Sequence, residues 1–398
     1  MTAQGTSDLY YDPYSVEIDA DPYPVYRRMR EEAPLYYNEP HDFYALTRFA
    51  DVEQSLLDAK TFISGRGGII ELIRADVEMP PGVLIFEDPP VHTVHRRLLS
   101  RVFSPRRVAE LEPKIREFCI RCLDPLVGAG GFDFIADLGA QMPMRVIGML
   151  LGIPEQDQEA VRDNTDANLR TEAGQPMKVS ENFIDGGLFE EYIDWRAENP
   201  SDDIMTELLR AEFEDETGTV RRLTRDELLT YIAVVAGAGN ETTTRLIGWT
   251  GKVLADHPDQ RRELVGDRSL IPGAVEELLR FETPAPHMAR VTSRDVELHG
   301  QVVPEGSIVQ MIPASANHDD RRFPDGDRFD IHRSDGPPLT FGFGIHLCLG
   351  SALARLEGRV ALDEVLNRFP TWDVETDKAH LAPTSTVRGW ETLPVTTP

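Results

Sequence analysis

Cysteine is scarce in this sequence, with three residues in 398. Three cysteines cannot form the disulfide framework of a small secreted domain, and a single one is too few for a structural zinc site. No apolar run approaches the ~20 residues that span a bilayer. The first residues, MTAQGTSDLYYDPYS, lack the basic and apolar regions of an export signal. We therefore expect a cytoplasmic protein without a membrane anchor.

Positive charge is also in deficit. The formal net charge is −27, which argues against nucleic acid and anionic membranes as partners because both repel such a surface. Residues 92–121, however, include eight Lys and Arg but three Asp and Glu. This basic segment is either a solvated face or a docking surface for an acidic partner.

Repeats and low-complexity linkers do not occur, so one domain over residues 1–398 is the simplest organisation. The pattern predicts a mainly α protein with a minor β portion. Helices are expected near residues 23–34, 51–60, 224–257, 271–281 and 349–369, and short strands near 42–49 and within 296–312. The helix that begins after Thr224, with Glu227 completing a capping box, runs for about 33 residues. At roughly 50 Å it would cross the whole domain.

Residues 63–90 are rich in glycine and proline yet strongly apolar, and loops of this kind usually cover something apolar. Cys119 and Cys122 form a C-x-x-C pair that could indicate redox or zinc chemistry. Their spacing from Ile115 and Phe118 instead continues the core stripe of a helix, and no second ligand pair follows. We therefore expect these two cysteines to pack in the core.

The third cysteine, Cys348, lies in FGFGIHLCLG at residues 341–350, immediately before the last long helix. A thiol becomes a good ligand or nucleophile only as thiolate, and a helix N-terminus supplies favourable potential. Gly342 and Gly344 would let the backbone curl beneath the sulfur, Gly350 would admit a flat partner, and Phe341 would exclude water. A nucleophile, an axial haem ligand and a buried structural cysteine all remain open at this point.

The loop resembles the haem-binding motif F-G-x-G-x-H-x-C-x-G of the cytochromes P-450. The resemblance extends from DPYPVYRRMREEAP to RGWETLPV and implies the helical prism fold of that family. It also implies haem b, with the Cys348 thiolate as the proximal iron ligand.

AGAGNETTT, residues 236–244, resembles the family's oxygen-binding groove. The Thr242 hydroxyl can bond back to the Ala238 carbonyl and loosen the helix locally, while small side chains leave room for dioxygen. The resemblance makes Thr242 the hydrogen-bond donor to oxygen and Glu241 the source of protons. Asn240 precedes the acid and could bias the water chain.

Further matches concern cations. His92 and Arg96 lie one helical turn apart, and the resemblance sends both, with Arg290 and His346, to the haem propionates. Glu277 and Arg280 match the structural E-x-x-R pair, for which Arg328 would be the third member.

Matching segments also give a mostly apolar substrate pocket, in which His287 either orients a polar substrate group or is a satisfied loop histidine. Trp390 would shorten the pocket. The candidate wall residues are Ile69, Ile70, Leu72, Ile73, Val234, Val235, Ala238, Pro286, His287, Met288 and Trp390.

The resemblance thus implies a soluble, bacterial-type monooxygenase that inserts oxygen from dioxygen into a lipid, terpenoid, steroid or aromatic compound. Electrons would come from a separate ferredoxin and ferredoxin reductase. The ferredoxin would dock at Arg97, Arg101, Arg106 and Arg107, aided by Arg355 and Arg359. A peroxygenase, a redox-neutral isomerase or dehydratase, and a non-enzymatic haem sensor are the rivals. The Glu241–Thr242 pair argues against the first two, and the sensor would need a signalling module or partner surface.

Overall fold

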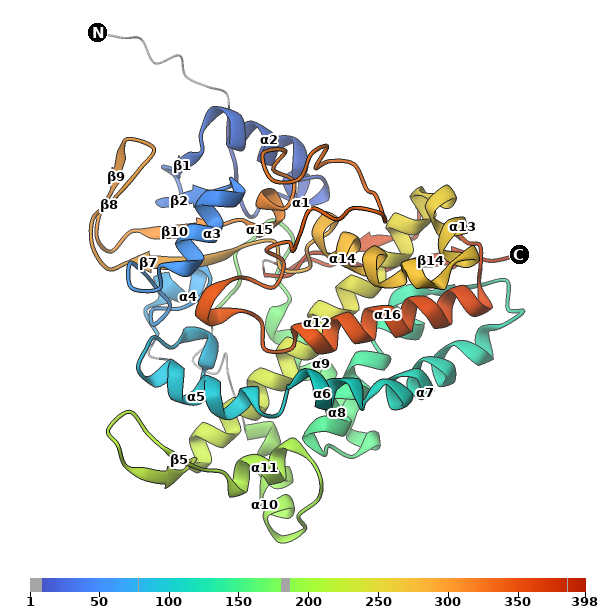
Figure 1. Cartoon of the computed structure of the whole chain (residues 1–398), viewed down its shortest axis with the longest axis horizontal. Helices are drawn as coiled ribbons and strands as arrows, with labels where there is room; N and C mark the ends of the chain where they lie inside the picture. The colour runs from blue at the N-terminus through green and yellow to red at the C-terminus, as the bar shows by residue number, and fades with distance from the viewer. Residues whose placement is uncertain (1–8, 78, 180–186, 385) are drawn as a thin grey trace.

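The computed structural model describes residues 9–77, 79–179, 187–384 and 386–398. The predicted mainly α architecture with small sheets is confirmed. Figure 1 shows the largest sheet at the upper left, α12 running through the centre, and α16 and α7 at the right. The α-helices are α1 Val16–Ala20, α2 Tyr23–Glu32, α3 Phe49–Leu57, α4 Ile70–Ala75, α5 Val91–Ser100, α6 Pro105–Ala109, α7 Glu112–Leu123, α8 Met142–Leu151, α9 Gln158–Leu169, α10 Glu190–Glu198, α11 Ile204–Arg210, α12 Arg225–Asp256, α13 Pro258–Gly266, α14 Ile271–Phe281, α15 Pro313–Ala316 and α16 Ser351–Arg368.

The strands form one five-stranded sheet, one three-stranded sheet and three two-stranded ones. The largest has the order β1-β2-β10-β7-β3, in which β2 and β10 run parallel and every other pair is antiparallel. The strands are β1 Leu35–Asn38, β2 Phe43–Leu46, β3 Phe62–Ile63, β4 Gly131–Asp133, β5 Glu212–Glu214, β6 Val220–Arg222, β7 Met288–Thr292, β8 Val296–Leu298, β9 Gln301–Val303, β10 Ile308–Met311, β11 Asp373–Val374, β12 His380–Leu381, β13 Trp390–Thr392 and β14 Pro394–Thr396.

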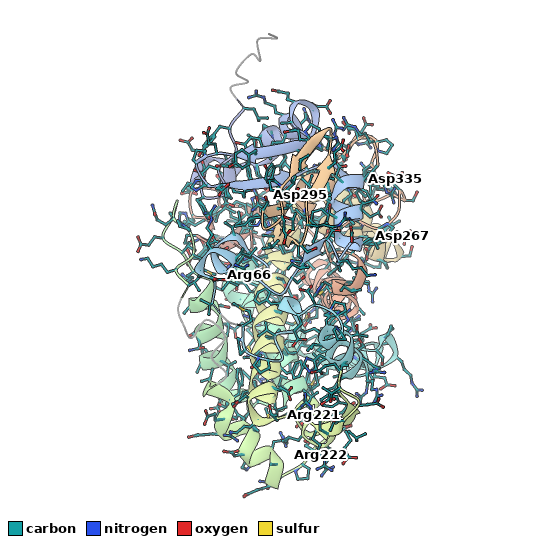
Figure 2. The ribbon with its side chains drawn as sticks, turned by 90° about the vertical axis from the view of Figure 1, so that its left-hand side faces the viewer. Arg66, Arg221, Arg222, Asp267, Asp295 and Asp335 are labelled. Atoms are coloured by element: carbon teal, nitrogen blue, oxygen red, sulfur yellow. The ribbon has the colours of Figure 1, made fainter. Side chains whose placement is uncertain are left out.

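Helix α12 is the central element, as its length predicts. Its capping box is present: the Thr224 side chain accepts from the Glu227 N–H, and the Glu227 carboxylate accepts from the Thr224 N–H. The helix packs against α8, α9, α14 and α16, so its middle crosses the interior. Figure 2 shows the two ends of the molecule, with Arg221 and Arg222 of the β5–β6 hairpin far from Asp295, which precedes β8.

A buried ion cluster joins α14 to the irregular segment that follows α15. Arg280 donates to Glu277 at 2.7 and 2.8 Å and to the backbone carbonyls of Asn317 and Gly326 at 2.7 Å. The third side chain of the cluster is Arg333, 3.2 Å from Glu277. The assignment of Arg328 was wrong, because its guanidinium faces solvent beside Asp330 and only its carbonyl accepts from Arg280.

Two further outcomes concern short segments. The apolar loop of residues 63–90 contains helix α4, which buries three of its six side chains, so part of its apolar character belongs to helix packing.

On α7, Cys119 is buried in the main core and Cys122 packs against that core, which confirms the structural role expected for both. Burial raises the pKa of the Cys119 thiol well above its ordinary range, so it is no thiolate ligand.

The described residues contain one stretch, Phe134–Leu151, that is long and apolar enough to cross a membrane, with a mean hydropathy of 1.3 over 18 residues. Of that stretch 61 % is buried against the rest of the protein, including α12 and α7. Such burial is typical of a core helix, so the stretch is weak evidence for a membrane span.

Candidate active site

The loop that carries Cys348 depends on two glycines in the left-handed region. Gly342 has φ 69° and Gly344 has φ 70°, as the sequence predicts. A Cβ on Gly344 would also lie 2.7 Å from the Leu56 carbonyl oxygen, so this glycine is required twice over. The loop closes through a 2.8 Å hydrogen bond from the Cys348 N–H to the Phe341 carbonyl, and α16 begins three residues later.

The Cys348 thiol is accessible to solvent, yet protein surrounds it closely enough to change its titration. Burial raises the pKa of Cys348, while the Gly350 N–H, Arg96 and Arg355 act in the opposite direction without offsetting it. Helix-terminal amides and cations therefore prepare this sulfur for an anionic state that the protein alone does not complete. A bound metal ion would complete it, because coordination removes the thiol proton.

The two sides of this loop differ. Behind it, the Arg355 guanidinium lies 4.4 Å from the centroid of the Phe341 ring and pairs with Glu276 of α14 at 2.5 Å. In front of it, a Cβ built on Gly350 would meet no atom within 4 Å. A rigid aromatic and ion-paired backing with an open front suits a flat ligand above the sulfur.

Four basic side chains from three separate segments, two arginines and two histidines, converge beside this loop and are called the cation cluster below. The rings of His92 on α5 and His346 lie 4.3 Å apart between centroids. Arg96, one turn after His92, donates to the Leu347 carbonyl at 2.5 Å, next to Cys348. Arg290 on β7 completes the group, since its charge and those of His92 and Arg96 all act on His346.

This cation cluster has too few anions. Burial, followed by Arg290, His92 and Arg96, lowers the pKa of His346 to about 3, and burial lowers that of Arg290 to about 10. The buried His92 Nε2 has no hydrogen-bond partner among the described residues. Asp88 acts on Arg290 and His92, but its oxygens already accept from the Ser64 and Gly65 N–H groups. The cluster therefore calls for an anionic ligand.

The middle of α12 supplies the second half of the site. Its turn at Ala238 is exposed and Thr242 is half-buried, whereas most of the helix around them is buried. The Thr242 hydroxyl donates to the Ala238 carbonyl at 2.9 Å, as predicted. Glu241 is buried, pairs with Arg245 on the next turn, and lies beside Asp166 of α9.

A sequence model of the family described as Cytochrome P450 matches residues 165–387. The chain belongs to the cytochrome P450 family. It is 36 % identical over 405 residues to the vitamin D(3) 25-hydroxylase of Pseudonocardia autotrophica, covering 100 % of this chain and 98 % of that one. Among solved structures it resembles cytochrome P450 CYP109Q5 from Chondromyces apiculatus, with a TM-score of 0.86, 34 % identity and coverage of 97 % and 98 %. It also resembles CYP109E1 from Bacillus megaterium in complex with testosterone, with a TM-score of 0.84 and 27 % identity. The match covers 96 % of this chain and 99 % of that one.

As a cytochrome P450 monooxygenase, the protein uses haem b, and the residues present fit that group. Haem is a flat ring with one central iron and two propionate groups. The chain offers an open glycine-lined front at Gly350, an accessible sulfur at Cys348, and a cation cluster with an unpartnered His92 Nε2. His92, Arg96 and Arg290 lie outside the motif, so the charge of the site adds evidence beyond it.

The candidate pocket residues separate into groups. Ile69 and Val234 pack against one small cluster with Leu72 and Phe86, and the methyl group of Met288 lies near Gly342. Ile70 and Val235 pack in larger apolar cores, and both stay candidate wall residues.

Two aromatic candidates have defined surroundings. Trp390 lies against Trp249 of α12, with ring centroids 5.3 Å apart, and its carbonyl accepts from Arg245. Burial lowers the pKa of His287 to about 4, so this histidine is neutral at physiological pH.

A cavity of about 590 Å³ opens between Gly65 and Val91 and includes Asp88, but none of its lining residues comes from α12 or the Cys348 loop.

Sequence reasoning missed two residues of this region. Asp166 reaches Glu241 from a helix that lies 75 positions earlier in the chain, and no motif marks it. Arg333 was missed because another arginine, Arg328, precedes it in the same irregular segment.

Proposed function

We propose that this cytochrome P450 inserts one oxygen atom of dioxygen into an apolar small molecule, such as a lipid, terpenoid, steroid or aromatic compound, by hydroxylation or epoxidation. Its electrons come from a separate ferredoxin and ferredoxin reductase, in the cytoplasm. The main observation behind the proposal is the cation cluster, which lacks anionic partners and lies directly beside the accessible Cys348 sulfur.

Cys348 would hold the haem iron, with Phe341 and Arg355 fixing its loop. His92, Arg96, Arg290 and His346 would hold the propionates, and the unpartnered His92 Nε2 would gain a hydrogen bond. When bound there, haem supplies the activation of dioxygen and its transfer to a C–H or C=C bond. Propionates beside this cluster would raise the pKa of His346 from its low value.

Thr242 and Glu241 control protons on the opposite side. The Thr242 hydroxyl gives its hydrogen bond to Ala238, which leaves the oxygen lone pairs available to accept from water. Glu241 is the neighbouring acid from which Thr242 receives a proton, and its burial excludes bulk water from the exchange. A restricted proton supply favours oxygen insertion over release of peroxide.

The apolar substrate class is supported by side chains of the candidate pocket wall. Ile69 and Val234 share a cluster with methionine and phenylalanine neighbours, Met288 approaches Gly342, and His287 is neutral. A wall of this composition stabilises an apolar ligand chiefly through buried surface. The named substrate of the vitamin D(3) 25-hydroxylase and the testosterone bound by CYP109E1 belong to the same chemical class.

A ligand screen tests the proposal. Purified holoenzyme is titrated with testosterone, a long-chain fatty acid, a monoterpene and an alkylbenzene, and displacement of the sixth iron ligand is read as a blue shift of the Soret band. Ligands that shift the band are then incubated with NADPH and surrogate ferredoxin and reductase. We expect at least one product heavier by one oxygen atom derived from ¹⁸O₂. Oxidation with hydrogen peroxide but not with NADPH and dioxygen would instead identify a peroxygenase.

A further inference from the structure

Two carboxyl groups meet between helices α9 and α12. Asp166 lies against Glu241, and the Asn240 side-chain amide donates to the Asp166 carboxyl at 3.1 Å. The charge of Glu241 acts directly on Asp166. Because neighbouring carboxylates repel each other, we expect this pair to hold one shared proton. The α9–α12 packing that brings them together is visible near the centre of Figure 1.

The two acids differ in burial and in their ion-pair partners. Glu241 is buried and is paired with Arg245, whose other contact is the Trp390 carbonyl. Asp166 is half-buried, and Arg245 and Arg162 are the cations that act on it. Arg162 is shared with Asp163 and with the Ala140 carbonyl. Burial first, and then the charge of Glu241, raise the pKa of Asp166 to about 7, which favours its protonated form.

This arrangement resolves a difficulty with Glu241. Glu241 is ion-paired with Arg245, and its burial separates it from bulk water. Such a group needs a protonated neighbour to carry a proton inward. Asp166 is that neighbour, with one side toward Glu241 and enough exposure to exchange with water.

We propose that Asp166 is a positioning residue for proton delivery, passing its proton to the Glu241 carboxylate and recovering it from solvent. The inference rests on the proposed role of Glu241 and Thr242. In each transfer the Asp166 O–H bond breaks, a Glu241 O–H bond forms, and the negative charge moves to Asp166. The Asn240 amide and the Arg162 guanidinium stabilise that charge until a water proton neutralises it.

The experiment uses the holoenzyme and Asp166→Asn, which keeps the shape and removes the titrating proton. Glu159→Gln on the same helix is the matched control, because its carboxylate is 77 % exposed and lies 3.4 Å from Arg162. The carbonyl infrared band of a protonated carboxyl group, which requires no turnover, is followed against pH. Coupling of NADPH use to product, its pH profile and the solvent deuterium isotope effect are measured in parallel, and Asp166→Glu tests rescue.

We expect a protonated-carboxyl band that titrates near neutral pH in the wild type and in Glu159→Gln, and that is lost in Asp166→Asn. Coupling should fall about tenfold in Asp166→Asn, less than a positioned proton donor itself contributes, because Glu241 remains. The neutral leg of the pH profile should disappear, the isotope effect should rise, and Asp166→Glu should recover most of the coupling.

A band, a pH profile or a coupling ratio unchanged in Asp166→Asn would overturn the inference, while uncoupling by Thr242→Ala in the same assay would show that the proposed function stands. If Thr242→Ala and Glu241→Gln also leave coupling unchanged, the proposed proton path is wrong and the role of Asp166 falls with it.

Discussion

At the scale of single residues, α12 contains a natural comparison. Thr242 and Thr250 both donate their hydroxyl hydrogen to the carbonyl four residues earlier, at 2.9 and 2.8 Å. Thr242 is half-buried beside the exposed Ala238, whereas Thr250 is buried in packed protein. The same helix hydrogen bond therefore occurs in two environments, and only Thr242 lies next to an exposed turn of α12.

We predict that Thr242→Ala leaves haem binding intact but diverts electrons to peroxide. The coupling of NADPH to product should fall by about 10²-fold or more, the range of a positioned proton donor. Thr250→Ala removes an equivalent helix hydrogen bond and should change coupling by less than twofold while lowering the melting temperature slightly. Peroxide release and product yield, measured with one redox-partner mixture, separate the two. Equal coupling in Thr242→Ala and wild type would contradict the assignment.

Glu357 on α16 is a second residue whose surroundings set its charge. It is 1 % exposed, accepts a hydrogen bond from Thr243 at 3.4 Å, and its other oxygen has no partner among the described residues. Burial raises the pKa of Glu357 well above its ordinary value of 4.5. The folded protein therefore keeps a proton there that the unfolded chain releases above that value.

This difference fixes the sign of a stability change. As pH rises above about 4.5, the unfolded state loses the proton first, so the Glu357 contribution to stability falls with rising pH. We predict that Glu357→Gln, which is neutral and of similar shape, weakens the fall in melting temperature between pH 6 and 9. Glu364→Gln on the same helix, which removes an acceptor shared by Arg116 and Arg368, should lower the melting temperature at both values. A steeper pH dependence in Glu357→Gln would contradict this account.

At the scale of elements, the stability of the region behind the haem site depends on how α14 is fastened. Arg280 is almost fully buried and donates to Glu277 and to three backbone carbonyls of the segment between α15 and the Cys348 loop. Arg333 brings a second cation to Glu277 from the same segment. One carboxylate therefore connects a helix to a segment that contains turns but no described helix or strand.

We predict that Glu277→Ala costs about 3–5 kcal/mol, because it leaves Arg280 buried without its counter-charge. Haem content should fall with it, since the segment leads into the Cys348 loop. Arg333→Ala should be clearly destabilising, whereas Arg328→Ala should stay within about 0.5 kcal/mol, as for an exposed side chain. Urea unfolding and haem absorbance per protein measure both effects. A larger loss in Arg328→Ala than in Arg333→Ala would reverse the assignment.

At the scale of the whole molecule, a chain with a net charge of −27 must present a local positive surface to bind an acidic electron donor. Arg106 and Arg107 are exposed but have carboxylate neighbours, Glu110 and Glu207. Arg97 and Arg101 at the end of α5 are exposed as well. The last two are therefore the strongest candidates within the predicted docking surface.

We predict that Arg97→Glu and Arg101→Glu together lower the apparent affinity for a ferredoxin at least tenfold, and that the remaining activity loses its sensitivity to salt. Arg27→Glu on α2, far from α5 in Figure 1, is the control and should leave the salt dependence unchanged. Steady-state rates against ferredoxin concentration at two ionic strengths give the comparison. Wild-type affinity in the double variant would exclude this docking surface.

Local chemistry explains which features could be predicted from the sequence. The left-handed Gly342 and Gly344, the capping box at Thr224 and the bond from Thr242 to Ala238 each depend on residues within a few positions, and all three are confirmed. Asp166, Arg333 and the core positions of Ile70 and Val235 depend on how distant elements pack. A single sequence without a motif at those positions contains no signal for them.

The central claim is that the Cys348 sulfur binds haem iron as a thiolate, supported by the cation cluster of His92, Arg96, Arg290 and His346. The most direct measurement is the absorption spectrum of the purified, reduced protein under carbon monoxide, for the wild type and Cys348→Ser. We predict the Soret maximum characteristic of thiolate ligation in the wild type and its complete loss in Cys348→Ser, together with loss of oxidation. A wild-type spectrum without that maximum, or full activity in Cys348→Ser, would contradict the account.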